Sequence, residues 1–356
     1  MEVVPDVRTT DRGRTPVPYD GPALLAAAAG EPEDFFRKAP TMNFFSFPTS
    51  RASSAYPYLS HLPETTGARA LVLGGGGATG NAWLIGVLAG LASEDLDVST
   101  PQLTVGTSAG STAAAQLASS TPAELYQAII GSPAPSASIP RPAAAPGSVR
   151  VPDQLSRITS ISAASSGPGD MHRRMGAAAL DLPGASDREL SLRWRSIVQS
   201  RMEETDWPQR LVYLTAVQAQ GGEPVVFDNS SGVPLVDAVA ASCSSGPPYW
   251  LGERAYIDGG YRRNENADLA QGYGKVLVLS PLGGRSLHPE RWGMQLSAQV
   301  DQLRASGSQV QVIVPDAAAE AHLGVNAMNQ ALRPAAAREG FRQGRELAGE
   351  LRAFWC

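Results

Sequence analysis

The sequence is poor in the residues that build metal sites and disulfide frameworks. Its 356 residues include two cysteines, Cys243 and Cys356, and four histidines. Two cysteines make no disulfide framework, and no cluster of histidine, cysteine, aspartate and glutamate has the spacing of metal ligands. We therefore expect a protein without a metal or a cofactor that works in a reducing compartment such as the cytoplasm.

Long apolar runs and an excess of basic residues are also missing. No run of about 18 apolar residues occurs, and the acidic start Met1-Glu2 lacks the charged region of a signal peptide. The 29 basic and 34 acidic residues give a net charge of −5, which offers no basic face to nucleic acid. Hydrophobic residues make up 43% of the chain, enough for a sizeable core in one or two domains. The sequence predicts a soluble, unexported protein that does not bind nucleic acid.

Residues 1–66 are the least regular part of the sequence, rich in proline, serine and small polar residues. This composition predicts a flexible N-terminal arm in front of a domain over residues 67–356. Five of the eight phenylalanines of the chain fall inside the arm, at Phe35, Phe36, Phe44, Phe45 and Phe47. Such a cluster either packs along the domain as a strap or anchors the protein peripherally at a membrane. The sequence leaves both interpretations open.

A glycine loop, Gly74–Gly80, follows the apolar segment Leu71–Leu73. Apolar residues then recur at helical spacing. The pattern Gly75-x-Gly77-x-x-Gly80 also fits a dinucleotide-binding loop, but that loop requires an acidic residue near the end of the next strand. The next strand ends in Gly106-Thr107-Ser108, which disfavours the cofactor interpretation. We expect a loop that presents a row of main-chain N–H groups.

A second strand, Leu103–Val105, runs into the pentapeptide Gly106-Thr107-Ser108-Ala109-Gly110 and then into an alanine-rich helix. G-x-S-x-G between a strand and a helix is typical of a nucleophile elbow, because small flanking residues permit the sharp turn that exposes the serine hydroxyl. The glycine loop and the elbow belong to one strand–helix–strand unit, so both lie at the carboxyl end of one parallel sheet. We expect Ser108 to face the N–H groups across a crevice.

The rest of the sequence alternates between helices and strands. A Pro/Ala-rich loop and a helical insertion occupy about residues 131–205, and an insertion at this place commonly caps a crevice. Strands are expected at Leu211–Val217, Val225–Phe227, Ala255–Ile257, Lys275–Ser280 and Val310–Val314. The alternation predicts a three-layer α/β/α fold with a mostly parallel central sheet.

A base for Ser108 is the next requirement of acyl transfer. None of the four histidines lies in a recognisable site context. Asp258 follows a strand and precedes Gly259 and Gly260, which leave its carboxylate uncrowded at the edge of the sheet. An aspartate with an ordinary pKa of about 3.9 is ionised at neutral pH but is a weak base. By itself, Asp258-Gly259 is more typical of a plain turn than of a catalytic base.

Taken together, the three motifs resemble the patatin-like phospholipases, and the bacterial members most. The glycine loop, the elbow and Asp258-Gly259-Gly260 occur in the family order, and 33 residues separate Gly75 from Ser108 (108 − 75). The resemblance extends through Ala241-Ser242-Cys243 to Asn264 and Asn266, and it covers roughly residues 68–315.

The resemblance implies a lipid acyl hydrolase with a Ser-Asp dyad and a patatin-like fold. Ser108 is then the nucleophile, Asp258 the general base, and the N–H groups of Gly75, Gly76 and Gly77 the oxyanion hole, with an acyl lipid or another ester as substrate. Two departures stand out. Thr79 occupies a position where the family usually has arginine or lysine, so Thr79→Arg is expected to raise activity, the alternative being a buried charge that destabilises the protein. The stretch Cys243–Pro248 is short and altered.

Two other interpretations stay open. One is an α/β-hydrolase esterase whose triad joins Ser108 and Asp258 to His288 or His322, although its oxyanion loop and elbow are normally further apart. The other is a catalytically weak lipid-binding relative, which the missing cation at Thr79 favours. The sequence does not identify the acyl ester or the oligomeric state.

Overall fold

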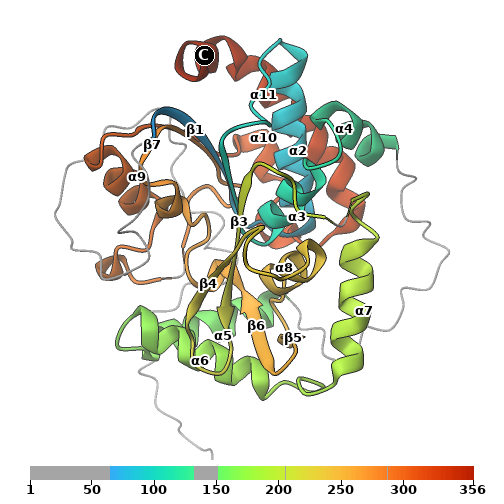
Figure 1. The fold of residues 1–356 in the computed structure, drawn as a ribbon, viewed down its shortest axis with the longest axis vertical. Coiled ribbons are helices and arrows are strands. Elements are labelled where there is room, and N and C mark those ends of the chain that lie inside the picture. Colours follow the sequence, from blue (N-terminus) through green and yellow to red (C-terminus); the bar gives the residue numbers. More distant parts are fainter. Residues whose placement is uncertain (1–64, 132–150, 205, 287) are drawn as a thin grey trace, which may run out of the picture.

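A central sheet of eight strands organises the protein. The computed structural model describes residues 65–131, 151–204, 206–286 and 288–356, and Figure 1 shows their arrangement. The strand order is β5-β6-β3-β2-β1-β7-β8, and β4 pairs with β3 outside this series. The predicted N-terminal arm with its phenylalanine cluster and the Pro/Ala-rich loop lie outside the described residues, apart from the end of the arm, where β1 begins at Thr65.

Five strands form the parallel part of the sheet. They are β1 (Thr65–Leu73), β2 (Leu103–Gly106), β3 (Leu211–Gln218), β7 (Tyr273–Leu279) and β8 (Gln309–Ile313). β1 pairs with β2 on one side and with β7 on the other, both in parallel register. Their apolar runs are buried on both faces, as expected for parallel strands covered by helices.

The sheet becomes antiparallel beyond β3. There β3 pairs with β4 (Pro224–Phe227) and with β6 (Arg254–Asp258), and β6 pairs with β5 (Tyr249–Leu251), all antiparallel. The last residues of β3 extend beyond the end of β2, and β6 pairs with this extension through Ala216 opposite Asp258. β6 therefore runs antiparallel to β2, and its last residue, Asp258, lies near the last residue of β2.

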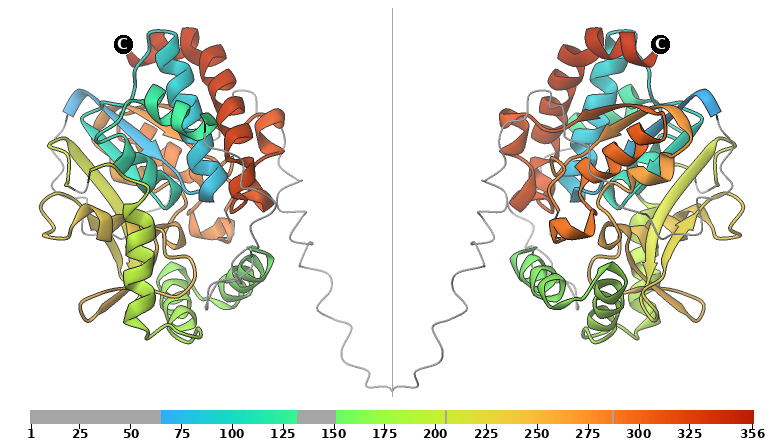
Figure 2. Two further views of the ribbon diagram at one scale, coloured as in Figure 1. Left: turned by 90° about the vertical axis from the view of Figure 1, so that its right-hand side faces the viewer. Right: turned by 90° about the vertical axis from the view of Figure 1, so that its left-hand side faces the viewer.

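Alternate residues of β1 pack against different helical layers, one on each face of the sheet. Leu71 and Leu73 belong to one core cluster, and Ala70 and Val72 to another. The first cluster includes α2 (Gly77–Ser93), α3 (Ala109–Gln116), α4 (Pro122–Gly131), α8 (Leu235–Ser242) and α11 (Arg333–Trp355). The second includes α9 (Leu296–Ala305) and η3 (Ala267–Ala270) (Figures 1 and 2). This arrangement confirms the predicted three-layer fold with its mostly parallel sheet.

Helices α2 and α11 pack unusually close to each other because glycines line their contact. A Cβ atom on Gly86 would lie 2.2 Å from the carbonyl oxygen of Ala337, and one on Gly344 would lie 2.3 Å from that of Val87. The two helices run in the same direction, so their first turns lie together. This packing brings Arg333, the first residue of α11, to the beginning of α2.

The helical insertion contributes α5 (Val151–Ala164), α6 (Pro168–Leu180) and α7 (Arg188–Gln199). The N-cap of α6 is Gly167, and a proline stands in its first helical position. α6 packs through Met171 and Met175 against Val217 and Ile257 at the antiparallel edge. The insertion thus supports the same edge of the sheet that carries Asp258.

Short elements complete the described chain: η2 (Gly259–Tyr261), η4 (Glu290–Trp292), α10 (Ala317–Glu320), η5 (Gly324–Asn326) and η6 (Gln330–Leu332). Within the described ranges, no helix has the length and apolarity needed to cross a membrane.

Candidate active site

Ser108 occupies the turn between β2 and α3 in a backbone conformation that is rare for a residue with a side chain. Its φ is 52° and its ψ is −111°. The flanking glycines are required by close packing: a Cβ on Gly110 would lie 1.8 Å from the carbonyl oxygen of Leu73, and one on Gly106 would lie 2.8 Å from Cα of Ser111. The strained turn leaves the Ser108 side chain partly exposed in a cavity, as a nucleophile elbow requires.

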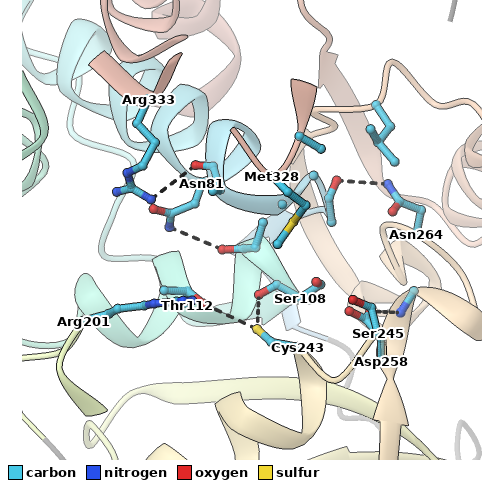
Figure 3. Close-up of a pocket in the computed structure, with 18 of the residues that line it drawn as sticks. Asn81, Ser108, Thr112, Arg201, Cys243, Ser245, Asp258, Asn264, Met328 and Arg333 are labelled. Atoms are coloured by element: carbon cyan, nitrogen blue, oxygen red, sulfur yellow. Dashed lines mark hydrogen bonds between the residues drawn. The ribbon is translucent and has the colours of Figure 1, made fainter. Parts of the chain in front are cut away.

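Two consecutive residues of the α8 C-terminus hold the main chain of Ser108. The Ser108 N–H donates to Oγ of Ser242 at 3.0 Å, and Oγ of Ser242 lies 2.7 Å from that of Ser111. The thiol of Cys243 donates to the Ser108 carbonyl oxygen at 3.1 Å (Figure 3). Burial raises the pKa of Cys243 to about 12, so the thiol stays protonated and keeps its donor hydrogen. These contacts satisfy both main-chain polar groups of the strained residue.

Asp258 ends β6 and faces Ser108 across the cavity (Figure 3). Its carboxylate accepts the Gly260 N–H at 2.8 Å. Burial raises the pKa of Asp258 to about 6, while the hydrogen bonds from Gly260 and from the Ser108 side chain act in the opposite direction. With only 7% of its surface exposed, Asp258 is a stronger base than an ordinary aspartate and is still mostly ionised at neutral pH.

The α8 C-terminus also holds the Asp258 strand. The N–H of Asp258 donates to the Ser244 carbonyl oxygen at 2.9 Å. The consecutive residues Ser242, Cys243 and Ser244, which we call the α8 clamp, therefore contact both candidate catalytic residues. Sequence reasoning identified Ser242 and Cys243 only as part of a family resemblance, because their contacts span about 130 positions of the chain.

The glycine loop supplies fewer free donors than the resemblance implies. The Gly75 N–H already donates to the Asn264 carbonyl oxygen at 3.0 Å, so it does not point an unpaired hydrogen at a substrate. In the part of the chain that the structure describes, the N–H groups of Gly76 and Gly77 have no acceptor, and both residues line the cavity with Ser108. Neither position admits a side chain: a Cβ on Gly76 would lie 2.5 Å from Pro281, and Gly77 has φ +65°. Gly76 and Gly77 therefore remain as donors.

A buried polar network fixes the floor beneath these groups. The Asn266 side chain donates to the hydroxyls of Thr107 and Thr215 at 2.9 and 3.1 Å. A Cβ on Gly259 would lie 2.2 Å from the Thr215 hydroxyl, so the glycine after Asp258 is also required by packing. The network connects the elbow, β3 and the Asp258 turn, which preserves their spacing.

The cavity beside Ser108 has a volume of about 650 Å³. Glycine-loop residues and Asp258 line it together with apolar side chains from helices α4–α7 and the segment that follows them. The apolar side chains include Leu125, Ile129, Ile158, Met171, Trp194 and Met202. A cavity of this size with mostly apolar walls and a few polar groups at one place is typical of a site for an apolar ligand with one reactive group.

None of the histidines in the described part of the chain is placed to form a triad with Ser108 and Asp258. His288 lines the cavity, but its Nδ1 lies 2.9 Å from the Ser286 hydroxyl, and no contact to Ser108 or Asp258 appears among the described residues. Burial is the main reason why the pKa of His288 is lowered to about 4. His172 is fully buried away from the cavity lining, His322 is outside it, and His61 lies outside the described residues. The side-chain hydrogen bond to Ser108 involves Asp258 instead.

The structure corrects the expectation for Thr79. Its side chain is fully buried, and its hydroxyl has no partner within the described ranges, so an arginine here would bury an unpaired cation. A positive charge comes instead from Arg333, whose guanidinium donates to the Ala78 carbonyl oxygen at 3.3 Å. The close packing of α11 on α2 supplies this cation, which no local sequence pattern indicates.

The described residues contain no group of three or more histidine, cysteine, aspartate or glutamate side chains that is arranged to hold a metal ion.

Comparison with known proteins yields one match at the level of the family. A family model described as "Patatin-like phospholipase" matches residues 71–138, the segment that contains the glycine loop and the elbow. No curated protein matches the sequence. Among solved structures, the crystal structure of VipD from Legionella pneumophila is similar at 12% identity and a TM-score of 0.39, covering 81% of this chain and 67% of VipD. The family match confirms the resemblance to patatin-like phospholipases, a family of lipid hydrolases, for the matched segment.

Proposed function

We propose that this chain, with its patatin-like phospholipase segment, is a serine-dependent lipid acyl hydrolase that works with a Ser108–Asp258 dyad. The observation that carries the proposal is the direct apposition of a strained, partly exposed serine and a buried aspartate at one end of an apolar cavity. Gly76 and Gly77 are the proposed donors to the oxyanion.

The chemistry follows from the contacts of the two residues. Asp258 takes the proton of the Ser108 hydroxyl as the oxygen attacks the ester carbonyl. The negative charge that develops on the carbonyl oxygen meets the unpaired N–H groups of Gly76 and Gly77 and the positive end of α2. Asp258 then gives the proton to the departing alcohol, which leaves an acyl group on Ser108. Water releases the acid by the same steps, with Asp258 again as base.

The raised pKa of Asp258 supports its role as the base. Proton transfer is most effective when the pKa of the base is near the working pH, and burial moves Asp258 from its usual range to about 6. The hydrophobic walls exclude water from the same carboxylate and accommodate an acyl chain. The same apolar walls therefore raise the pKa of the base and bind the acyl chain of the substrate.

Replacement of Ser108 tests the proposal. Ser108→Ala should lower kcat for acyl esters by at least about 10⁴-fold, because the nucleophile and its base act as a unit. We would measure release of fatty acid from phospholipids, lysophospholipids, acylglycerols and short p-nitrophenyl esters. Ser306→Ala, at the exposed end of α9, is the matched control and should hydrolyse the same esters as the wild type. Ser108→Ala protein with wild-type rates and an unchanged melting temperature would refute the proposal.

A further inference from the structure

Two arginines from distant segments line the cavity on the side of Ser108 away from Asp258. Arg333 begins α11, and Arg201 follows α7; both line the cavity. Figure 3 shows them on the same side of Ser108, with Asp258 on the other. The acyl-ester end of the cavity thus lies between a carboxylate and a pair of cations.

Among the described residues, neither arginine has an acidic partner, in contrast to the third arginine of the cavity lining. Arg285, which also lines the cavity, pairs with Glu320 at 2.9 Å. By contrast, no carboxylate lies within 4.0 Å of Arg201 or Arg333 among the described residues. Within the described ranges, the Arg333 guanidinium donates to the Ala78 carbonyl oxygen alone, and the Arg201 guanidinium lies 5.2 Å from the centre of the Trp194 ring.

Glu203 is the carboxylate of the cavity lining nearest to Arg201 in the chain. It accepts a hydrogen bond from the Ser120 hydroxyl at 3.2 Å instead of an ion pair. Among the described contacts, Glu203 therefore forms no ion pair with Arg201 or Arg333.

The two cations act on each other electrostatically. Burial, and after it the charge of Arg201, lower the pKa of Arg333. An arginine remains protonated at neutral pH even after such a change, so the pair stays doubly positive. Arg201 is exposed and Arg333 is half-buried, so solvent screens part of their repulsion, and an anion bound between them lowers it further. Guanidinium groups bind the oxygens of phosphate especially well, through two parallel N–H donors.

From this geometry, and resting on the proposed hydrolase function, we infer that Arg201 and Arg333 form a phosphate-binding subsite that selects acyl esters with a phosphate group. The acyl chain lies along the apolar walls, the ester lies between Ser108 and the N–H groups of Gly76 and Gly77, and the phosphate lies against the two arginines. Contact between Arg333 and Ala78 fixes the subsite next to the glycine loop.

A pair of soluble substrates that differ only in the phosphate tests the inference. We would compare kcat/KM for 1-hexanoylglycerol 3-phosphate and for 1-hexanoylglycerol, both as monomers. The wild type should favour the phosphate ester by about tenfold or more, since a charge-assisted hydrogen bond contributes about that factor. Arg201→Gln and Arg333→Gln should each reduce this ratio about tenfold. Arg345→Gln, an exposed arginine on α11 that pairs with Glu94, is the matched control and should keep the wild-type ratio.

Calorimetric titration with inorganic phosphate provides a test that needs no hydrolysis, so it separates this inference from the proposed function. If the ligand is a free phosphate ion, the wild type should give measurable binding heat and both arginine variants should give none. The ratio of kcat/KM for the phosphate ester to that for the neutral ester would then be near one. That result would support the phosphate subsite with a free ion as its occupant. A ratio near one without binding heat would overturn the inference, as would arginine variants that melt and select substrates as Arg345→Gln does. Ser108-dependent hydrolysis of the neutral ester would leave the proposed function standing in either case.

Discussion

The parallel and the antiparallel parts of the sheet each contribute one half of the candidate dyad. Ser108 comes from the end of β2, inside a strand–helix–strand unit whose turn, strain and flanking glycines are all local. Asp258 comes from β6, which runs antiparallel to β3 and approaches the same place from the opposite direction. The nucleophile is thus positioned by its neighbours in the sequence, and the base by the topology of the sheet edge.

The two residues are also held at different energetic costs. Ser108 is strained in its backbone, and the α8 clamp compensates by pairing its N–H and C=O groups. Asp258 is unstrained, but its charge is buried and its pKa is raised to about 6. The proposed function therefore depends on backbone strain on one side of the cavity and on a desolvated charge on the other.

The largest expected effect separates a dyad from a triad. Asp258→Asn keeps the shape of the side chain but cannot accept the Ser108 proton, so kcat should fall by about 10⁴-fold. His288→Ala should cost less than about tenfold, because His288 contacts Ser286 and not the dyad. Initial rates with a soluble p-nitrophenyl ester measure both. If kcat fell roughly 10³-fold in His288→Ala or His322→Ala but little in Asp258→Asn, the base would be a histidine. The antiparallel part of the sheet would then not supply the base.

A second prediction concerns the buried position beside the glycine loop. Thr79→Arg should destabilise the fold by about 3–5 kcal/mol, because it places an unpaired cation in a fully buried site near Arg333. Thr79→Val removes a hydroxyl without a described partner and is the matched control, with a free energy of unfolding close to that of the wild type. Denaturant titration measures both. A Thr79→Arg protein of normal stability and raised turnover would restore the expectation from the sequence.

The third prediction separates activity from stability at Asp258. A carboxyl whose pKa is about 6 in the native state and about 3.9 in the unfolded state binds its proton more tightly when folded. Its ionisation therefore destabilises the native protein, by an amount that grows as the pH rises from 4 to 6 and is constant above. Asp258→Asn should be more stable than the wild type at pH 8, by up to about 3 kcal/mol, and the difference should vanish near pH 4.

Melting curves of wild type and Asp258→Asn across this pH range give the difference directly. The wild-type kcat should fall as the pH decreases through about 6, because the base becomes protonated. If Asp258→Asn were less stable than the wild type at pH 8, the Asp258 charge would be well solvated or paired. That result would contradict the prediction that ionised Asp258 destabilises the native protein.

The smallest expected effect concerns the α8 clamp. Ser242→Ala leaves the buried Ser108 N–H without its acceptor, and Cys243→Ala removes the donor to the Ser108 carbonyl oxygen. Each should lower kcat about tenfold with little change in KM, because the hydroxyl of Ser108 is misplaced while the substrate walls are intact. Cys243→Ser keeps a donor and should recover most of the loss. Equal changes in kcat and KM for all three variants would indicate a general packing defect instead.

The sequence predicted the parts of the site that are local. G-x-S-x-G between a strand and a helix identifies Ser108, since the turn itself requires small residues on both sides, and the structure shows these glycines in close packing. The alternation of helices with apolar strands was enough for the three-layer fold. The strand β5 was missed because three residues carry no periodicity.

Contacts between distant segments were outside the reach of sequence patterns. The Gly75 N–H is occupied by Asn264, a residue 189 positions away, so the number of free donors in the loop depends on tertiary structure. Thr79 supplies no positive charge beside the glycine loop, but Arg333 does. Arg333 reaches this place because the glycine-lined helices α2 and α11 pack side by side. Such substitutions preserve the charge near a site while changing the residue that supplies it.

Covalent labelling by a fluorophosphonate tests the central claim most directly, since that reagent phosphonylates an activated serine. Peptide mass analysis of the labelled wild type should show one adduct, on the peptide that contains Ser108. Ser108→Ala should show none, and Asp258→Asn should react at least about 100-fold more slowly, because Asp258 activates the hydroxyl. An adduct on another serine, or a rate of labelling that Asp258→Asn does not change, would contradict the Ser108–Asp258 dyad.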